Sequence, residues 1–535
     1  MSIHLNENTQ IPFPSKRNVH YAKSAMVATS HPLAAQAGID IIKSGGNAID
    51  AAIATAAMLT VVEPTSNGIG GDAFAIVWTQ NKLHGLNGSG PAPSAIDIPK
   101  LKALGHDKIP TFGMIPVTVP GTPAAWAALS RRFGKLSLTK ALEPAIKTAR
   151  EGFAITETVA KNWERAYKKY KEVLNGPEFE AWFEVFAPDN RAPMAGEVWK
   201  SELHAQTLES IAQTDARSFY EGELSKKIIK TSEQFGGYFS PQDLTEYTPE
   251  WVDPIRCAYR GYEVCEIPPN GQGISALMAL SILENFKLES FYAPHRLIEA
   301  MKLAFIDTKT HIADPKHMDY DYNLFLSKEY SKERASLISE KALQPSAGKP
   351  ELSGTVYLCT ADEEGNMVSY IQSNYMGFGS GVVVPGTGIA LHNRGHNFMF
   401  EEGHPNALEG GKRPLHTIIP GFLMKDGLPI GPFGVMGGFM QPQGHVQVIT
   451  NTLDYQMNPQ QALDAPRWQW IADMKITVEP NFPQHVIDDL IQRGHEVVIE
   501  PDVGSFGRGQ IIWRTKHGTY CGGTESRCDG HIASL

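Results

Sequence analysis

Two hydroxyl-bearing residues, Thr355 and Ser373, stand in segments whose composition predicts a pair of adjacent β-strands. On both sides of the turn-forming stretch 362–366, Asp-Glu-Glu-Gly-Asn, the chain is rich in β-branched and aromatic side chains. If Ala361 pairs with Met367 across this turn, Thr355 lies opposite Ser373, and opposed Cβ atoms are about 5 Å apart. The two hydroxyls could then share a hydrogen bond, provided that no bulge shifts the register.

The segments that precede this pair predict the elements that would position it. A helix is expected from His31, with a proline in its first turn, and a second, alanine-rich and buried helix is expected over 47–62, where Asn47 can cap its first turn. A glycine-dense loop at 67–72 then leads into an apolar strand at 73–78.

The character of the chain changes before the hydroxyl pair. Residues 120–345 are mostly helical in pattern, with a short strand at 260–267 that ends in a Pro-Pro-Asn-Gly turn. A cluster of proline, serine and glycine at 345–350 predicts a linker. The sequence therefore predicts an α+β protein with a largely helical part, 1–354, and a strand-rich part, 355–535.

The bulk composition excludes several classes of protein. The chain has 535 residues, a net charge of −10 and no run rich in lysine and arginine, so we expect no nucleic-acid partner. The longest apolar run, 51–62, is too short to span a bilayer, and the N-terminus lacks the basic and apolar regions of a secretory signal. We expect a soluble, cytoplasmic protein without a membrane partner. The five cysteines lack C-x-x-C spacing, which disfavours a thiolate zinc site.

A series of short motifs runs in order along nearly the whole chain. They are Asn67–Phe74, Val119–Pro123, Glu143–Phe153, Arg260–Val264, Ile267–Gly273, Glu299–Phe305, Ala313–Pro315, Gly354–Thr355, Gly365–Asn366, Phe378–Gly381, Gly388–Ile389, Lys412–Leu415 and Gly437–Gly438. In this order they resemble the γ-glutamyltransferase (glutathione hydrolase) family, whose members are N-terminal-nucleophile hydrolases. From Val27 to the C-terminus the chain resembles that family, and each motif is weak alone.

The resemblance implies a fold, a precursor and a set of catalytic roles. The fold would be an αββα four-layer sandwich, and cleavage between Gly354 and Thr355 would leave two segments in one intertwined core, a heterodimer. Thr355 would be the nucleophile and its freed α-amine the general base. Ser373 stands where the family has a second threonine that binds the nucleophile. Gly437 and Gly438 would donate backbone N–H groups to the oxyanion, although a tight turn alone would also explain them. No cofactor is implied.

The chain departs from the family at the residues that hold the two ends of a γ-glutamyl group. By alignment of motifs, the changed substrate-binding positions are Ser89 for an arginine, Tyr375 for an asparagine, Arg394 for a glutamine or glutamate, Asn397 for an aspartate, and His416 and Thr417 for two serines.

The altered charges predict a different acyl group. The change to Asn397 removes an anion and the change to Arg394 adds a cation, so a substrate ammonium would face Arg394 with no carboxylate nearby. Like charges a few ångströms apart cost several kcal/mol at an effective dielectric constant of about 20. Arg394 would instead bind a distal carboxylate on the acyl group. Alternatively, Arg394 points to solvent or pairs with Glu401 or Glu402.

Other motifs in the sequence do not indicate a lid, a metal site, a dinucleotide site or a serine nucleophile. The loop 398–412 is too short for the lid of many family members, which predicts an open pocket. His392, His396 and His404 are close in sequence, but we expect solvent contacts rather than a metal site. The loop 67–72 lacks the last glycine of G-x-G-x-x-G, and the chain has no G-x-S-x-G elbow.

Two functional hypotheses remain. The first is a self-cleaving threonine amidohydrolase or acyltransferase that resolves an acyl-Thr355 ester with water or an amine, with hydrolysis favoured. Its small-molecule substrate would be a γ-glutamyl-like amide or another carboxy-acyl amide; a glutaryl, cephalosporin-type acylase and an oxamate amidohydrolase are alternatives. The second is an unprocessed, non-enzymatic binding protein of the same fold.

Overall fold

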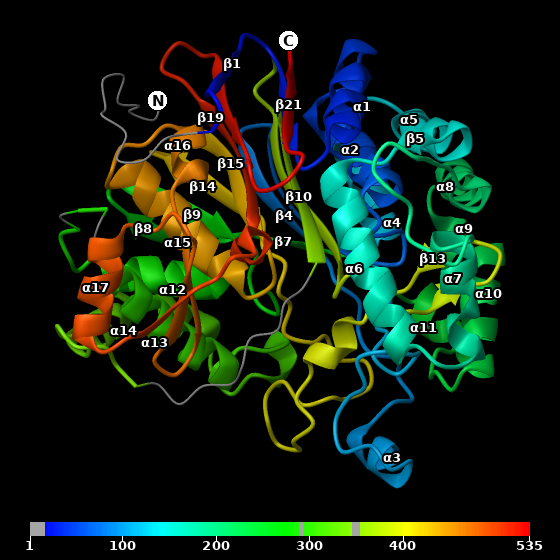
Figure 1. The fold of residues 1–535 in the computed structure, drawn as a ribbon. Coiled ribbons are helices and arrows are strands. Elements are labelled where there is room, and N and C mark those ends of the chain that lie inside the picture. The colour runs from blue at the N-terminus through cyan, green and yellow to red at the C-terminus, as the bar shows by residue number, and fades with distance from the viewer. Residues whose placement is uncertain (1–15, 289, 292, 345–353) are drawn as a thin grey trace.

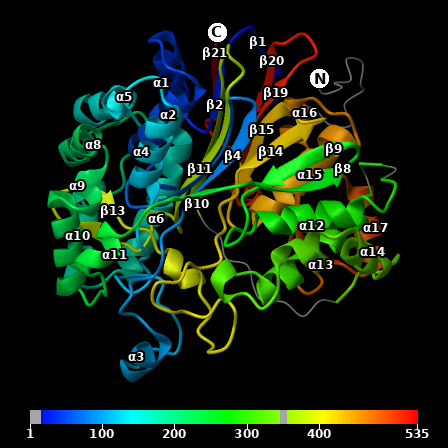
Figure 2. The same ribbon diagram turned by 180° about the vertical axis from the view of Figure 1, so that it is seen from behind.

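The computed structural model describes residues 16–288, 290–291, 293–344 and 354–535, which form four layers (Figures 1 and 2). Two seven-stranded sheets face each other, and helices cover the outer face of each. The first sheet has the order β21 (His531–Ser534), β2 (Met26–Thr29), β10 (Gly354–Ala361), β11 (Met367–Tyr375), β3 (Asp72–Thr79), β4 (Lys82–Gly88) and β7 (Glu250–Val252). The second has the order β1 (His20–Ala22), β20 (Tyr520–Thr524), β19 (Arg508–Arg514), β15 (Leu428–Met436), β14 (Gly421–Lys425), β9 (Tyr262–Glu266) and β8 (Ile255–Tyr259).

The helices fall into two groups, one for each sheet (Figure 1). Those on the side of the first sheet are α1 (Pro32–Lys43), α2 (Ala48–Val62), α4 (Thr122–Phe133), α5 (Leu138–Glu151), α6 (Glu157–Val173), α7 (Glu180–Phe186), α8 (Glu202–Thr214), α9 (Arg217–Tyr220), α10 (Glu223–Gln234) and α11 (Pro241–Thr245). Those on the side of the second sheet are α12 (Gly273–Leu283), α13 (His295–His311), α14 (Lys328–Ser336), α15 (Met440–Leu453), α16 (Pro459–Asp464) and α17 (Gln484–Arg493). The short helix α3 (Ile98–Ala103) projects below both groups in Figure 1.

Smaller elements complete the chain. They are the pairs β5 (Phe153–Ala154) with β6 (Val198–Trp199) and β12 (Val383–Val384) with β13 (Ile389–Ala390), and a sheet of β16 (Trp468–Ala472), β17 (Lys475–Val478) and β18 (Glu496–Ile499). Among the residues that the structure describes, no helix is both long and apolar enough to cross a bilayer.

The three largest apolar clusters of the described residues fill most of the space between the four layers. One joins the helices around α2 to the outer face of the first sheet, a second lies between the sheets, and a third joins α12, α13 and α15 to the second sheet. Every residue of α2 is buried, as the alanine-rich sequence predicts. Asn47 caps this helix, because its side chain accepts from the N–H groups of Ile49 and Asp50. The predicted cap is confirmed.

Each sheet combines strands from both sides of residue 354. In the first sheet β10 and β11 lie between β2 and β3, and in the second sheet β9 pairs with β14. Neither part of the chain completes a sheet by itself. The α+β, αββα sandwich that the resemblance implies is confirmed. The linker predicted at 345–350 lies outside the described residues, and the division into 1–354 and 355–535 stays a prediction because it depends on cleavage.

Candidate active site

The predicted strand pair forms, with a bulge at the end that carries the chemistry. Ala361 pairs with Met367 as expected, but the register shifts between Gly354 and Val356. The shift pairs Gly354 with Tyr375, so Thr355 is not a ladder partner of Ser373. The two hydroxyls nevertheless meet, with 3.1 Å between Thr355 Oγ1 and Ser373 Oγ.

The Gly354 carbonyl oxygen belongs to the same hydrogen-bonded group. It accepts from Thr355 Oγ1 at 2.7 Å and from Ser373 Oγ at 2.8 Å. The side chains of Thr355 and Ser373 are buried. The bond between Gly354 and Thr355 therefore lies beside two buried hydroxyls.

Tyr375 closes one side of this group in a strained conformation. Its φ of +74° is in the left-handed region, which is uncommon for a bulky residue. Its N–H donates to Ser373 Oγ at 2.8 Å, and its hydroxyl donates to Asn397 Oδ1 at 3.2 Å. The bend after β11 thus links the hydroxyl pair to Asn397, and Asn397 in turn donates to the carbonyl of Leu415.

Arg394 lies over the Tyr375 ring and is buried. Its Cζ is 4.4 Å from the ring centroid, and Nη1 donates to Thr417 Oγ1 at 2.6 Å. Burial lowers the pKa of Arg394 to about 10, while the nearby Asp72 opposes that shift, so the side chain stays cationic at neutral pH. The alternative of a solvent-facing Arg394 paired with an exposed glutamate is wrong, because Arg394 is buried and its charged neighbour is Asp72.

The expectation that no carboxylate lies near Arg394 is wrong, because Asp72 lies beside it. Asp72 Oδ2 is 3.5 Å from Arg394 Nε, 2.8 Å from His416 Nε2 and 3.3 Å from His392 Nδ1, and all four side chains are buried. Burial alone would raise the pKa of Asp72, but the two facing histidines outweigh it and hold that pKa well below its usual range. No local pattern along the chain indicates this cluster, because Asp72 and His416 are 344 residues apart.

The two histidines of this cluster have defined partners. Burial, and then the Arg394 cation, lower the pKa of His416 to about 3, so a neutral ring donates Nε2–H to Asp72 and accepts from the N–H of Ile418 at Nδ1. His392 Nε2 donates to the carbonyl of Thr118 at 2.8 Å. The expectation that His392 contacts solvent is wrong, since it lies at the centre of the site.

Ser89 lies at the edge of the site within a triad of polar side chains. Its Oγ donates to Asn87 Oδ1 at 2.6 Å and accepts from Asn270 Nδ2 at 3.2 Å. The backbone carbonyl of Asn270 accepts from the N–H of His416 at 2.8 Å, and His416 connects the triad to Asp72. Asn87 and Asn270 were not singled out from the sequence, although the Pro-Pro-Asn-Gly turn pointed to the second of them.

Gly437 and Gly438 form the bend between β15 and α15. Their φ values of +132° and +58° are ones that glycine adopts without strain. The side-chain amide of Gln272 donates both to the Gly438 carbonyl at 2.9 Å and to the Thr417 carbonyl at 2.6 Å. This shared donor joins the glycine bend to Thr417 and Arg394. That the bend binds an oxyanion stays a prediction.

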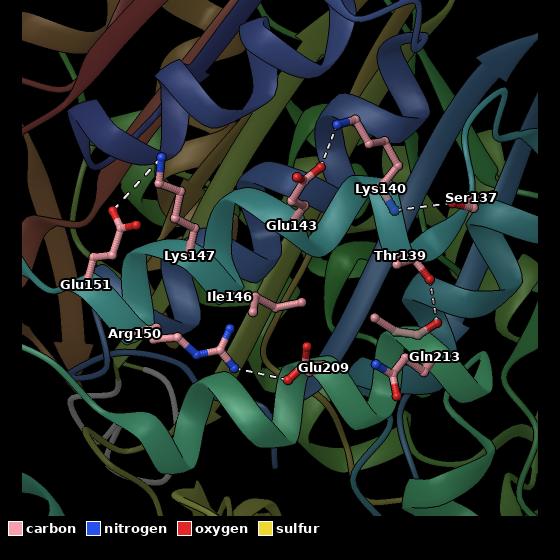
Figure 3. Close-up of a pocket in the computed structure, with 11 residues that line it drawn as sticks. Ser137, Thr139, Lys140, Glu143, Ile146, Lys147, Arg150, Glu151, Glu209 and Gln213 are labelled. Atoms are coloured by element: carbon pink, nitrogen blue, oxygen red, sulfur yellow. Dashed lines mark hydrogen bonds and ion pairs between the residues drawn. The ribbon is translucent and has the colours of Figure 1, made fainter.

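The groove between α5 and α8 is separate from this site (Figure 3). Its volume is about 530 Å³, and it is lined by side chains of those two helices, including Lys140, Glu143, Arg150 and Glu209. These charges neutralise one another, since Lys140 pairs with Glu143 and Arg150 pairs with Glu209. The groove contains none of the residues around Thr355.

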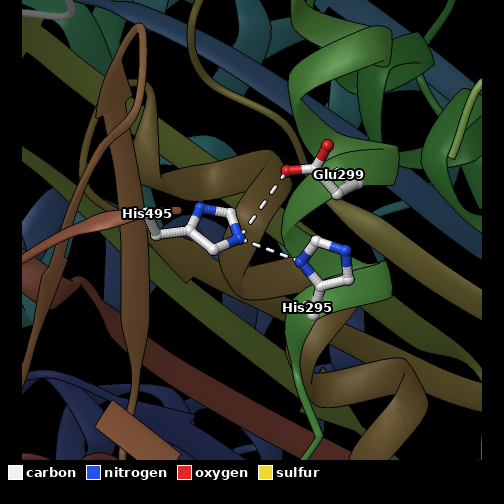
Figure 4. A group of neighbouring side chains, drawn as sticks. All are labelled: His295, Glu299 and His495. Atoms are coloured by element: carbon white, nitrogen blue, oxygen red, sulfur yellow. Dashed lines mark hydrogen bonds and ion pairs between the residues drawn. The ribbon is translucent and has the colours of Figure 1, made fainter. Parts of the chain in front are cut away.

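Within the described part of the chain, one cluster has the side chains of a metal site, and it also lies elsewhere. His295, Glu299 and His495 converge in the interior (Figure 4). The ammonium of Lys302 is 2.8 Å from Glu299 Oε1 and donates to His495 Nδ1, while His295 Nδ1 and His495 Nε2 are 2.9 Å apart. Lys302 already supplies the positive charge of this cluster, so we assign it no metal.

Comparison with known proteins agrees with this geometry. A family model described as gamma-glutamyltranspeptidase matches residues 34–535. The glutathione hydrolase-like YwrD proenzyme of Bacillus subtilis (strain 168) is 37% identical, over 95% of this chain and 98% of the relative. The acylase ACY 1 proenzyme of Pseudomonas sp. (strain SE83) is 32% identical, over 94% of this chain and 92% of its own length.

A solved structure extends the similarity to three dimensions. The crystal structure of cephalosporin acylase from Bacillus halodurans superposes with a TM-score of 0.94 and 56% sequence identity, over 99% of each chain. Sequence, fold and the arrangement around Thr355 lead to the same assignment. The chain belongs to the gamma-glutamyltranspeptidase family and is an enzyme of the N-terminal-nucleophile hydrolase type.

Proposed function

We propose that the chain is a proenzyme that cuts itself between Gly354 and Thr355 and then uses Thr355 to hydrolyse amides. The observation that carries this proposal is the hydrogen-bonded group of Thr355, Ser373 and the Gly354 carbonyl. Thr355 Oγ1 attacks the Gly354 carbonyl carbon, the peptide C–N bond breaks, and an ester forms. Water then opens the ester and leaves a carboxylate on Gly354 and a free amine on Thr355.

Turnover reuses the same groups on an external amide. The freed α-amine of Thr355 accepts the hydroxyl proton as Oγ1 attacks the substrate carbonyl, and the departing amine takes a proton. Ser373 holds the nucleophilic oxygen through the hydroxyl contact already described. The Gly437–Gly438 bend supplies N–H groups for the oxyanion, and one such donor is worth about 2.7–4 kcal/mol. Water resolves the acyl-Thr355 ester more readily than an amine, because the glutamate-binding set is altered.

The substrate is an amide whose acyl group carries a distal carboxylate. Arg394 supports this assignment because it is a buried cation held beside the hydroxyl pair by Tyr375 and Thr417. A glutaryl-type acyl group meets this requirement, and two of the similar proteins carry acylase names. Asp72 gives a specific reason to keep γ-glutamyl amides as a second candidate, since its carboxylate could accept hydrogen bonds from an α-ammonium.

Denaturing electrophoresis of the purified protein tests the proposed cleavage. Wild type should separate into fragments 1–354 and 355–535, and Thr355→Ala should remain one inactive chain. A full-length wild-type band that persists on long incubation would contradict the proposed self-cleavage. Cleavage that continues in Thr355→Ala would show that another residue is the nucleophile.

A hydrolysis panel tests the acyl assignment. Glutaryl, γ-glutamyl and oxamate-type amides of one leaving group are compared in wild type and Arg394→Ala, with Arg493→Ala on α17 as a control outside the site. Glutaryl amides should be the best substrates and should lose at least tenfold in kcat/KM with Arg394→Ala only. If γ-glutamyl amides are preferred and Arg394→Ala changes nothing, the carboxylate assignment is wrong.

A further inference from the structure

Asp72 contacts three side chains that arrive from separate parts of the site. A single oxygen, Oδ2, lies within 3.5 Å of Arg394 Nε, His392 Nδ1 and His416 Nε2, and none of these groups reaches solvent. A buried carboxylate with three such neighbours fixes their relative positions, because moving any one of them would expose an unpaired charge or donor.

The strand register brings this carboxylate beside the nucleophile. Asp72 is the first residue of β3 and lies directly opposite Ser373 of β11. Residues opposite each other in an antiparallel pair project to the same face of the sheet. Ser373 uses that face to contact Thr355. Asp72 therefore stands next to the hydroxyl pair, and the contacts of its carboxylate go to Arg394 and the two histidines.

The contacts of Arg394 leave one part of its guanidinium unused. Tyr375 covers one face of the group, Thr417 accepts from Nη1, and Asp72 lies at Nε. Within the described part of the chain, Arg394 Nε and Nη2 are both buried without a hydrogen-bond partner. Nε still has the 3.5 Å ion-pair contact with Asp72, whereas among the described residues no contact of this kind is found at Nη2. A buried donor without a partner is costly, and a substrate carboxylate oxygen would satisfy it.

We propose that Asp72 is the positioning residue that sets acyl specificity, by holding Arg394 so that Nη2 is presented to the carboxylate of the acyl group. This inference rests on the proposed function and adds the residue that makes it selective. Asp72 also offsets the charge of Arg394, and His416 is neutral near pH 7. The anion of the acyl group is thus recognised through the direction in which Nη2 is presented.

If Asp72 acts through Arg394, the effect of replacing Asp72 depends on whether Arg394 is present, and a double-mutant cycle measures this dependence. Wild type, Asp72→Asn, Arg394→Met and the double variant are assayed on two isosteric amides, a glutaryl amide and its neutral glutaramoyl counterpart. Glu266→Gln is the matched control, because Glu266 is also a buried carboxylate paired with a histidine, His445, but lies outside the site.

Asp72→Asn should lower the preference for glutaryl over glutaramoyl about tenfold, with the change in KM rather than kcat. In the Arg394→Met background the same substitution should have less than about a twofold effect on that preference. Glu266→Gln should keep the wild-type preference. Self-cleavage of each variant on a gel reports that it has folded.

Two outcomes would overturn the proposal. Equal losses on both amides would show that Asp72 only supports the fold, and a full Asp72→Asn effect in the Arg394→Met background would show that it does not act through Arg394. Failure of the proposed function looks different, since wild type would then remain uncut or would turn over neither amide.

Discussion

At the scale of single residues, the site depends on a hydroxyl pair formed at a bulge. Ser373 Oγ contacts Thr355 Oγ1 and the Gly354 carbonyl oxygen, and it accepts from the N–H of Tyr375. A serine can make the contact that the resemblance assigns to the family's second threonine, because only the hydroxyl takes part. The bulge shifts Thr355 out of the regular strand register. The hydroxyls of Thr355 and Ser373 are in contact although the two residues are not ladder partners.

Removing the Ser373 hydroxyl should slow both cleavage and turnover. Ser373→Ala leaves the Gly354 oxygen with one donor fewer, so we expect self-cleavage and kcat to fall at least tenfold, or about 1.4 kcal/mol. Ser373→Thr should stay within about threefold of wild type. Timed gels and steady-state kinetics measure both rates.

Ser369→Ala provides the control for Ser373→Ala. Ser369 lies on the same strand and its hydroxyl bonds Tyr357, away from Gly354. Equal losses in Ser369→Ala and Ser373→Ala would show a general effect on β11 rather than a role at the scissile bond.

Residue spacing predicted the hydroxyl pair but missed the charges around it. Thr355 and Ser373 lie on adjacent strands joined by a short turn, so local pairing rules place them together. Asp72, Arg394 and His416 meet only through the packing of β3 against β11 and the loops that follow. The motif containing Asp72 was recognised, yet nothing in its spacing shows which charges its carboxylate will face.

At the scale of elements, the bend between β15 and α15 needs glycine. Gly437 has a φ of +132°, and a Cβ added there would lie 3.1 Å from Gly507 Cα. The same bend is joined to Thr417 through Gln272. A shift in this bend would therefore move both the predicted oxyanion donors and the residue that binds Arg394.

Gly437→Ala should lower kcat/KM more than it lowers stability. A non-glycine residue at this positive φ costs about 1–3 kcal/mol of stability, whereas a displaced oxyanion donor is worth about 2.7–4 kcal/mol, so we expect a loss of about 100-fold in kcat/KM. Gly427→Ala is the control, because Gly427 also has a positive φ of +74° but nothing within 4 Å of an added Cβ. Equal kinetic losses in both variants would remove the argument for an oxyanion role.

Elements were predicted better than their order in the sheets. The cap and the alanine-rich composition predicted α2, and the β-forming residues on both sides of a turn predicted the β10–β11 pair. These signals are local in the sequence. The placement of β10 between β2 and β11 is non-local, and no pattern within the strands indicates it.

At the scale of the whole molecule, a buried polar joint links the two parts of the chain. Glu299 and Lys302 of α13 form a fully buried ion pair, and Lys302 also donates to His495 of the C-terminal part. Both backbone groups of Leu343 bind this pair, since its N–H donates to Glu299 and its carbonyl accepts from Lys302. The joint would keep the end of the large segment in place after cleavage.

Lys302→Met should destabilise the protein without changing acyl preference. It leaves the Glu299 carboxylate buried and unpaired, which costs about 3–5 kcal/mol. Lys140→Met, at an exposed pair with Glu143, should cost less than about 1 kcal/mol. Denaturant unfolding of both variants measures the difference. Equal and small losses would mean that the joint contributes nothing to the assembly of the two parts.

Buried histidines predict a loss of stability in acid. Burial lowers the pKa of His204 to about 4 and that of His495 to about 3, both below the ordinary value of 6.5. Between each lowered pKa and the ordinary value of 6.5, these histidines bind protons in the unfolded chain but not in the folded chain. The free energy of unfolding therefore falls as pH drops below about 6.5. Each such histidine contributes a slope of up to about 1.4 kcal/mol per pH unit.

His204→Gln should reduce the slope of the free energy of unfolding against pH by up to about 1.4 kcal/mol per pH unit, which corresponds to one bound proton. Unfolding midpoints measured from pH 7 to pH 5 give the slope, and the exposed His517→Gln is the control. An unchanged slope in His204→Gln would contradict the assignment of a neutral, buried ring.

The most direct test of the account is the mass and N-terminal sequence of the fragments, followed in parallel with activity from the moment of purification. The account predicts that amide hydrolysis rises in step with a new chain whose first residue is Thr355 and whose α-amine is free. Full activity in protein whose Gly354–Thr355 bond is intact would contradict it, because the nucleophile would then lack its base.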